Sequence, residues 1–487
     1  MDAIEKDAAE LLRLAWSAKK LFASINQVPP EVLSTIPGYC HGEEDDVDRA
    51  LIAFTHVCHD WREIFISRSS LWTRLDFKNI DKTDTYIKRS QSSPLKFHLK
   101  KSIIDKDMVN LLTPNICRVK SLTIDMYFLP NILKHFHCNA PLLEKLEIRG
   151  PPRGLDLDNA LFNRDLSSIR ELCLHGVTTH FPRKFSKKNL ANLQVLDFKY
   201  CTHGYEITQF LNILESAPLL HTILLDCKWL VTPKTPPKQI VPLHHLKVFS
   251  MTTFSRLSFL LPQLHIPTGA SLKLDSNCGV DESVFLDYLP ERSPYLNNLS
   301  HITAIDLYFE PRWRHVILSG PSGHLETKLT LAPQSRAGNG QILHSLSHPI
   351  FSKTQRLVIS GDENLSSSLK NGEYSVLVLQ MLSSMSSLQS LTLINSKSQF
   401  FILALDPENN SGVILCPDMT ELILEPWKPS DAEYLIKMVK NRASRGVTPV
   451  PLSFKFTSFH CLMEEVNELK KYVMDVEHIG GNLSLSA

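Results

Sequence analysis

The sequence lacks an excess of charge of either sign. Its 52 lysine and arginine residues nearly balance 51 aspartate and glutamate residues, and the formal net charge is +1. No overall field would draw such a chain to nucleic acid or to an anionic membrane, so neither is expected as a partner. The sequence also lacks the run of about 18 apolar residues that a membrane-spanning helix requires.

A secretory signal is missing as well. The N-terminus carries Asp2, Glu5, Lys6, Asp7 and Glu10 and has no uninterrupted apolar segment. The ten cysteines are scattered singly, and no Cys-x-x-Cys pair occurs. Scattered cysteines in a chain without a signal indicate reduced, mostly buried thiols. We therefore expect a location in the cytoplasm, the nucleus or both.

Metal-binding patterns are weak. The strongest is Cys40 and His41 followed by His56, Cys58 and His59. Zinc sites need four ligands at defined short spacings, which this pattern does not supply, so a buried thiol with surface histidines is preferred. The acidic segment 45–48 lacks the glycine and the distal glutamate of a calcium loop. We expect no metal and no cofactor.

Catalytic motifs are absent from the sequence. It contains no GxGxxG, no P-loop, no GxSxG and no HExxH. A basic cluster at residues 183–188 is compatible with a nuclear-import or acidic-partner patch and with a solvated loop. We therefore expect no catalytic residues.

The chain does contain a predicted helix over residues 2–24. Ile4, Ala8, Leu11 and Ala15 recur near helical spacing. One short amphipathic helix is not stable alone, so this one is expected to pack on its neighbour.

Residues 25–77 form a stretch unlike the rest of the chain. Pro29 and Pro30 fit the first turn of a helix, which Pro37-Gly38 ends. A second helix is predicted from Ala50 through Phe65, because apolar residues recur every three to four positions. Between the two helices lies an acidic segment, Glu43 to Asp48, predicted to be a solvated loop or helix start.

This stretch resembles the F-box motif, and the layout looks like the F-box proteins that are abundant in mushroom-forming fungi. The matching segments are Val28-Pro29-Pro30-Glu31-Val32-Leu33, Val57-Cys58-His59-Asp60-Trp61-Arg62 and Leu71-Trp72. The link between the two helices is longer and more acidic than in the commonest version of the motif. The resemblance implies docking to the Skp-type adaptor of a cullin–RING ubiquitin ligase. The adaptor-binding residues would be Pro29, Pro30, Leu33, Ile36, Val57, Trp61 and Trp72.

Behind the F-box-like domain, residues 78–116 are predicted to be a connector, with a helix near 84–89 and a strand at 94–99. From residue 117 to 460 the pattern L-x-x-L-x-L recurs, with Val119–Ile124, Leu143–Ile148, Ile169–Leu174 and Leu193–Phe198 as clear copies. Further copies centre on Ile223, Val248, Leu272, Ile305, Leu329, Leu357, Leu391, Leu422 and Leu452. Helices are predicted between strands at 207–220, 284–288, 374–382 and 431–443, and loops at 233–242, 332–340 and 360–371. The fold class expected is α/β, a helical F-box module followed by a curved leucine-rich-repeat-like solenoid with parallel strands inside and helices outside.

A last amphipathic helix is predicted over 461–478, where Leu462, Val466, Leu469 and Val473 recur at helical spacing. It would cap the open end of the array, and the final residues to 487 are expected to form a tail.

Side chains alternate along strands, so polar residues beside the buried leucines should share the concave face. These are Glu147, Arg149, Cys173, His175, Asp197, Lys199, Asp226, Asp275, Asp306 and Tyr308. The candidate substrate-binding residues are Arg149, His175, Lys199, Asp226, Asp306 and Tyr308. Their mixed charge favours a protein or peptide ligand, and an inert solvated face is the alternative.

Three functional hypotheses follow. The resemblance implies a non-catalytic, substrate-recognition subunit of a Skp–cullin–F-box (SCF) ubiquitin ligase, in the ubiquitin-conjugation pathway. The alternative is a repeat-based interaction scaffold whose F-box is vestigial or serves non-ubiquitin assembly. An enzyme would need a pocket with convergent ionisable groups, for which the sequence supplies no candidate. The substrate is not encoded in a readable motif.

Overall fold

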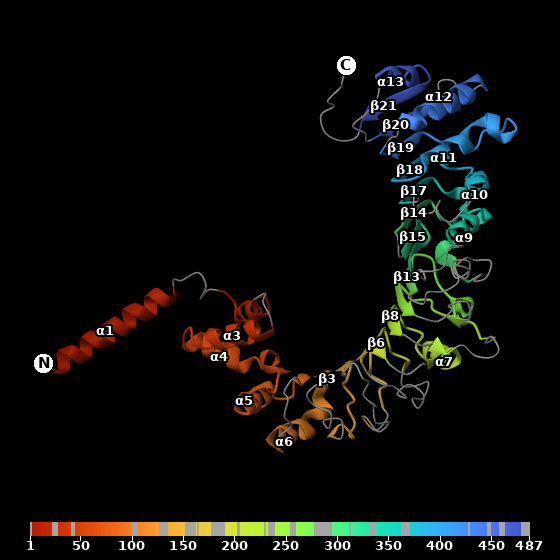
Figure 1. Ribbon diagram of the computed structural model, residues 1–487. Coiled ribbons are helices and arrows are strands. Elements are labelled where there is room, and N and C mark those ends of the chain that lie inside the picture. Colours follow the sequence, from red (N-terminus) through yellow and green to blue (C-terminus); the bar gives the residue numbers. More distant parts are fainter. Residues whose placement is uncertain are drawn as a thin grey trace. The chain divides into compact units, whose positions relative to one another are not determined.

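The structure is a computed structural model (Figure 1). It describes residues 2–21, 28–39, 44–99, 106–125, 135–150, 162, 165–176, 190–201, 205–227, 230–231, 239–253, 260–276, 295–310, 313–330, 338–361, 371–426, 429–445, 450–456 and 463–478. Two compact units divide the chain. The first comprises Met1–Glu147 and Ala160–Ser168, the second Ile148–Asn159 and Ile169–Ala487.

The fold is mixed α/β, as expected from the sequence. The described residues form twelve α-helices and, besides two small pairs of strands, seventeen strands in mostly parallel sheet. None of the helices among these residues has both the length and the apolar character needed to cross a membrane.

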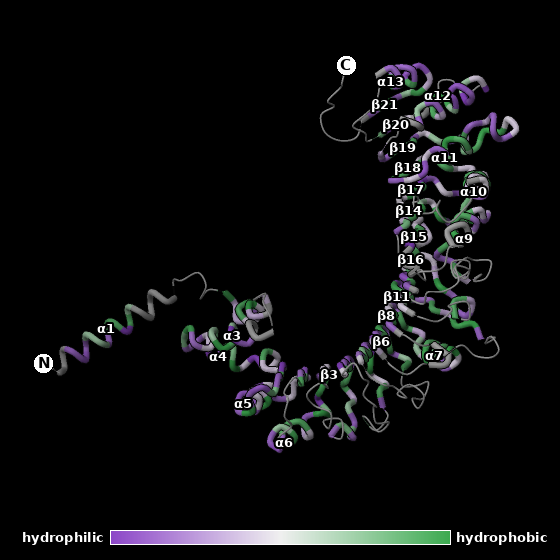
Figure 2. The backbone as a smooth tube through the Cα atoms, viewed as in Figure 1, coloured by the Kyte–Doolittle hydropathy of each residue, from purple (hydrophilic) through white to green (hydrophobic). Residues whose placement is uncertain are grey.

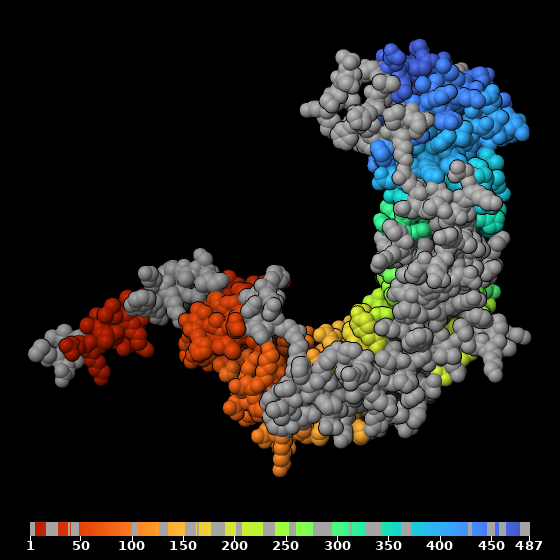
Figure 3. Space-filling view, in the orientation of Figure 1, coloured from red at the N-terminus to blue at the C-terminus, as the bar shows by residue number. Residues whose placement is uncertain are grey.

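The first unit begins with helices and ends with strands. Its elements are α1 (Asp2–Leu21), α2 (Pro30–Leu33), η2 (Ile36–Tyr39), α3 (Glu44–Phe54), α4 (His59–Ser67), η3 (Ser69–Trp72), β1 (Arg74–Leu75), α5 (Ile80–Ser90), β2 (Leu95–Leu99), α6 (Lys106–Asn115), η4 (Ile116–Arg118), β3 (Val119–Asp125) and most of β4 (Lys145–Arg149). In the space-filling view the orange atoms, which belong to the later helices of this unit, lie together in one body (Figure 3).

The N-terminal helix is confirmed, but its expected packing is wrong for the described side chains. Residues 5–15 of α1 are all exposed, including Leu11, Leu12 and Leu14. The start of the next helix is confirmed, because Pro29 is the N-cap of α2 and Pro30 its first residue.

The single helix predicted from Ala50 through Phe65 is wrong. The chain turns between α3 and α4, where Cys58 is extended at φ −161° and serves as the N-cap of α4. Arg62 Nε donates to Thr55 O over 2.9 Å across this turn. The acidic segment is a helix start, because α3 begins at Glu44.

The connector predicted at 78–116 is part of the sheet. Strand β2 pairs in parallel with β1 on one side and with β3 on the other. Helices α5 and α6 alternate with these strands, so the strand–helix alternation begins at Arg74 rather than at residue 117.

The second unit contains most of the strands. They are β5 (Glu171–His175), β6 (Val195–Cys201), β8 (Thr222–Cys227), β11 (Val248–Thr253), β13 (Ser271–Ser276), β14 (Ala304–Phe309), β15 (Trp313–Gly320), β16 (Gly323–Thr330), β17 (Arg356–Ser360), β18 (Ser390–Ile394), β19 (Glu421–Glu425), β20 (Val450–Phe456) and β21 (Val473–His478). The helices are α7 (Ile207–Glu215), α9 (Gly338–Ser345), α10 (Asn371–Ser384), α11 (Ser398–Leu405), α12 (Pro429–Ser444) and α13 (Met463–Leu469).

The parallel pairing expected of the repeats is confirmed over most of this unit. Strands β5, β6, β8, β11 and β13 pair in sequence order, as do β17 to β21. Equivalent leucine positions stack in register and are fully buried, as Leu196, Ile223, Phe249 and Leu272 show. Figure 2 shows the alternation of apolar and polar residues along these strands.

Strands β14, β15 and β16 depart from the repeat pattern. Strand β13 pairs in parallel with β16, the three strands form an antiparallel meander, and β14 then pairs in parallel with β17. The spatial order is therefore reversed at this point. Pro321 and Ser322 form the loop between Gly320 and Gly323, and Gly323 has φ +147° with only 2.7 Å between an added Cβ and Ala270 O.

The helix predicted over 461–478 is wrong in its second half. Helix α13 ends at Leu469, and Val473–His478 is strand β21, paired with β20. Short apolar runs fit both the helical and the strand period. Here residues 473–478 pair with the edge of β20 and so form a strand. The helices at 207–220, 374–382 and 431–443 are confirmed as α7, α10 and α12, whereas 284–288 lies outside the described residues.

The three predicted loops are described only in part. Val241–Pro242 is β10, paired with β12 (Leu264–His265), and the short strands β7 (Tyr205–Glu206) and β9 (Leu230–Val231) form a similar pair. The loop predicted at 332–340 is wrong for its last three residues, because α9 starts at Gly338. Residues 183–188 lie outside the described part of the chain.

Candidate functional site

Two surfaces are candidates for binding: the helical module, defined as residues 28–77, and the polar face of the sheet in the second unit. The module contains the seven residues that the sequence assigns to adaptor binding. Three of them, Leu33, Trp61 and Trp72, are buried at 2%, 7% and 0% exposure. Pro29, Pro30 and Val57 are exposed, and Ile36 is half-buried. The seven residues are thus divided between the core and the surface.

The buried tryptophans organise the core of the module. Trp61 packs within 5.8 Å of Phe65 and 5.7 Å of Phe54, measured between ring centroids. Trp72 donates its Nε1–H to Phe65 O over 2.9 Å and meets Tyr86 edge-on at 4.9 Å. Aromatic residues in this arrangement stabilise the module beyond the burial of their area.

Four large apolar side chains remain exposed on the same module. They are Val32 on α2, Tyr39 on η2, Ile52 on α3 and Val57 in the turn before α4, with exposed fractions of 51%, 72%, 41% and 58%. Helix α3 contacts both η2 and α4, so the supporting elements pack together. Aromatic and aliphatic side chains that are exposed in this way can lose water on binding and so contribute to a protein interface. Of these four, only Val57 was predicted from the sequence as a binding residue. Val32, Tyr39 and Ile52 were missed, and only their spacing relative to the buried apolar residues could have indicated them.

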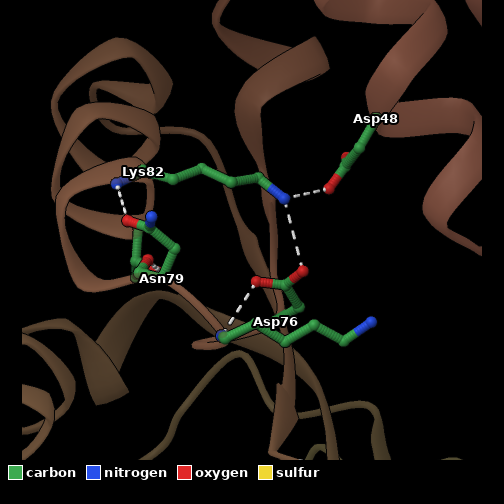
Figure 4. A network of polar contacts seen from close by, with 6 residues as sticks. Asp48, Asp76, Asn79 and Lys82 are labelled. Carbon is green, nitrogen blue, oxygen red and sulfur yellow. Dashed lines mark hydrogen bonds and ion pairs between the residues drawn. The ribbon is translucent and has the colours of Figure 1, made fainter.

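An ion-pair network fixes α3 to the first strand–helix unit (Figure 4). Lys82 Nζ of α5 lies 2.5 Å from Asp48 Oδ2 of α3 and 3.3 Å from Asp76 Oδ2 after β1. Asn79 caps α5 by accepting the Lys82 N–H over 2.9 Å, and Asp76 accepts the Lys78 N–H over 3.1 Å. Asp48 is only 15% exposed, so this end of the acidic segment is paired rather than fully solvated.

Electrostatics of the network favour the charged lysine. Burial lowers the pKa of Lys82, but its hydrogen bond to Asp48 and the charges of Asp48 and Asp76 outweigh this, and the pKa is raised. Burial raises the pKa of the neighbouring Tyr86 to about 12, with the Asp48 charge adding to it. Both groups therefore keep their protons at neutral pH.

The second candidate surface is the polar face of the sheet. The register aligns His175, Lys199 and Asp226 on successive strands, and the same row continues through Asp275 to Tyr308. Asp306 lies on this face two residues before Tyr308. Residues paired in register point to the same side of a sheet, so five of the six predicted residues share one face. The sixth, Arg149, is exposed on β4, and the following Gly150 donates its N–H to His175 O over 2.6 Å.

Two clusters of the same composition occur on this face. Asp197 Oδ2 lies 3.2 Å from His175 Nε2 and 3.0 Å from Lys199 Nζ. Burial raises the pKa of Asp197, but the hydrogen bonds with His175 and Lys199 together lower it by more, so the net shift of the pKa is downward.

In the second cluster Glu326 Oε1 lies 3.0 Å from Lys273 Nζ and 3.1 Å from His315 Nε2. Burial again raises the carboxyl pKa, and the contacts with Lys273 and His315 again leave it lowered. The sequence analysis did not single out Glu326, because the register that brings β13 to β16 is not visible in the repeat pattern.

Charges farther along the face are paired as well. Arg356 Nη2 lies 2.9 Å from Asp306 Oδ1, and Lys455 Nζ lies 3.0 Å from Glu421 Oε1. Between these pairs the register places Val358, Thr392 and Ile423 side by side on β17, β18 and β19. Val358 is 8% exposed and the other two are half-buried, so this part of the face carries two aliphatic side chains and one threonine in place of charged groups.

A pocket of about 280 Å³ lies between α10, α11 and η14 (Pro407–Asn410). Its walls are mostly apolar, and its polar groups are a serine hydroxyl and two side-chain amides. It is lined by Ser375, Val376, Leu379, Phe400, Leu403, Ala404, Asn409 and Asn410. These residues supply no ionisable group for acid–base chemistry.

No cluster of three or more His, Cys, Asp or Glu side chains suited to a metal ion occurs within the described residues. Of the residues that the sequence pattern singled out, Cys58 is half-buried and His56 and His59 are exposed, while Cys40 and His41 lie outside the described residues.

No protein-family model matches the chain, and no curated protein matches it either.

Proposed function

We propose that the protein is the substrate-recognition subunit of an SCF-type ubiquitin ligase. The observation that carries the proposal is the helical module, which exposes Val32, Tyr39, Ile52 and Val57 over a tryptophan-centred core. Apolar and aromatic side chains that lose water on binding dominate protein interfaces. The module therefore has exposed side chains of the kind that a protein interface uses. The resemblance of its sequence to the F-box motif indicates a Skp-type adaptor as the partner.

The sheet of the second unit is the substrate-binding part in this proposal. It would form the inner side of a curved solenoid, as in leucine-rich repeats. Its charges are largely paired with one another, and Val358, Thr392 and Ile423 form an uncharged row between the ion pairs. Nucleic acid binding would need unpaired cations along the face. A protein segment with apolar side chains fits this face better.

The protein would contribute no catalytic group. Ubiquitin transfer would be performed by the conjugating enzyme of the ligase, and this chain would supply effective concentration and orientation of the substrate.

Adaptor binding is tested with the full chain and a purified Skp-type adaptor by calorimetry. Val57→Asp places a charge in the proposed interface, and we expect at least a tenfold loss of affinity. Val376→Asp on α10 is the matched control, because its side chain is 51% exposed against 58% for Val57 and it belongs to the other unit. No binding by the wild-type chain, or equal loss in both variants, would refute adaptor docking through this module.

A second measurement separates the ligase subunit from a scaffold without a role in ubiquitination. A labelling enzyme is fused to the full chain, and proteins near it are identified while the proteasome is inhibited. Some of these proteins should have a longer lifetime when the gene is deleted. Adaptor binding without any such protein would favour the scaffold.

A further inference from the structure

Helix α1 exposes an apolar face that needs a partner. All side chains from residue 5 to 15 are exposed, and Leu11, Leu12 and Leu14 are exposed at 67%, 61% and 55%. The helix has 20 residues, which corresponds to about 30 Å of length. Most of the stability of helices in proteins comes from packing an apolar face against another element. A partner that covers this face of α1 would therefore stabilise the helix.

The charges of α1 divide into two opposite halves. Residues 2–10 carry four carboxylates and one lysine, a net charge of −3, and residues 11–21 carry Arg13, Lys19 and Lys20 and no carboxylate, a net charge of +3. An anionic membrane surface would repel the first half. A second copy in parallel orientation would bring like charges together. A second copy in antiparallel orientation places each acidic half beside a basic half.

We propose that α1 is a self-association element, which pairs with α1 of a second copy of this chain in antiparallel orientation. Ala8, Leu11 and Ala15 lie on one face of the helix and would be buried between the two helices, with Leu12 and Leu14 at the two flanks of this face. The two charge contacts would set the orientation, as flanking charges do in coiled coils. A pair of helices this short buries less area than a standard interface, so the association should be weak and concentration-dependent. The proposal is independent of adaptor binding, because it uses none of the residues of the helical module.

The first experiment compares the mass of the full chain across concentration by sedimentation. Two variants give both halves of the helix the same sign of net charge: Arg13→Glu/Lys19→Glu/Lys20→Glu is acidic in both halves but for Lys6, and Glu5→Lys/Asp7→Lys/Glu10→Lys is basic in both halves but for Asp2. Each alone should need at least a tenfold higher concentration to associate than the wild type. An equimolar mixture of the two should associate at least as readily as the wild type.

The mixture also separates pairing from helix stability. An acidic N-terminus and a basic C-terminus suit the macrodipole of a single helix, so charge reversal lowers helix content even without pairing. Mixing restores association only where the two helices contact each other. Variants that remain monomeric when mixed would overturn the proposal, as would a wild-type chain that is monomeric at all concentrations.

Orientation is tested by cross-linking. Glu5→Cys and Lys20→Cys chains are mixed, oxidised and digested, and the linked peptides are identified by mass spectrometry, which separates them from products of the ten native cysteines. We expect links between position 5 of one copy and position 20 of the other. Links between two copies of position 5 would show parallel pairing and overturn the antiparallel arrangement. Leu11→Asp in the same background should abolish the links in either case.

Discussion

Lys82 and Lys88 test how much burial adds to an ion pair. Both lie on α5, and the Nζ of each is 2.5 Å from an aspartate oxygen, Asp48 Oδ2 for Lys82 and Asp84 Oδ2 for Lys88. They differ in environment. The side chains are 27% and 15% exposed in the first pair, and 74% and 37% exposed in the second.

The expected losses follow from this difference. Lys82→Met retains most of the side-chain length but removes two charge-assisted contacts and leaves Asp48 facing Asp76. Hydrogen bonds to charged groups contribute about 1.5–3 kcal/mol each, and partial exposure reduces this through solvent screening, so we expect a loss of about 2–3 kcal/mol. Lys88→Met breaks an exposed i,i+4 pair and should cost less than about 0.5 kcal/mol.

Hydrogen exchange of α3 and α5, followed by mass spectrometry, measures the local free energy of opening. A loss of about 2–3 kcal/mol corresponds to exchange faster by a factor of about 30 to 150 for Lys82→Met. The raised pKa of Lys82 adds a pH test. Its contribution is fully present below the usual value of 10.5 and is lost as the pH rises through the higher folded-state value, so the effect should be constant between pH 6 and 9. Equal exchange in the Lys82→Met and Lys88→Met variants would refute the reasoning.

Three further predictions concern the second unit. The side chain of Arg442 is 1% exposed and donates hydrogen bonds to two loop carbonyls at 2.9 and 3.1 Å, so Arg442→Ala should lower the local free energy of opening by about 3–5 kcal/mol. Arg445 is exposed, and Arg445→Ala should lower it by less than about 1 kcal/mol in the same hydrogen-exchange measurement. Gly361→Ala should destabilise β17 by about 2 kcal/mol or more, because φ is +79° and the added Cβ would lie 2.4 Å from a carbonyl oxygen; Gly372→Ala, with nothing within 4 Å, should be neutral or slightly stabilising in thermal unfolding. The lowered pKa of Asp197 predicts stabilisation that is present above its usual 3.8 and lost as the pH falls through the lower folded-state value, so Asp197→Asn should be less stable than the wild type at pH 6 and the difference should shrink as the pH falls below 3.8.

The strands of the second unit could be predicted from sequence because each repeats the same two-residue alternation. A buried position such as Leu196 is followed two residues later by another, Phe198, and the next strand repeats the pattern. The alternation does not encode which strand pairs with which. Strand β15 does not contain the repeat pattern and was missed, although Gly320-Pro321 and Ser322-Gly323 mark a turn between two strands. The cluster of Lys273, His315 and Glu326 depends on the pairing of β13, β15 and β16 and was therefore not predictable, whereas His175, Asp197 and Lys199 lie on neighbouring repeats and were placed on one face from the sequence.

Helix boundaries failed where the apolar spacing continues through a turn. Phe54, Val57 and Trp61 follow helical spacing, yet the chain is extended at Cys58. The break leaves Val57 exposed while Phe54 and Trp61 pack together at 5.7 Å. Periodicity predicts which apolar residues are neighbours. It does not predict the hydrogen bond from the Arg62 side chain to Thr55 O, which spans the turn.

The motif residues of the helical module therefore have two separate physical roles. Leu33, Trp61 and Trp72 are nearly or fully inaccessible, so they act by holding the module together, and their replacement would reduce binding mainly by unfolding it. Val57, by contrast, is more than half exposed and can be changed without opening the core. A sequence match built on the buried residues is evidence for the fold of the module, and evidence for docking has to come from its exposed residues. This is why the charge introduced at Val57, rather than a tryptophan replacement, is the variant that tests the proposed interaction.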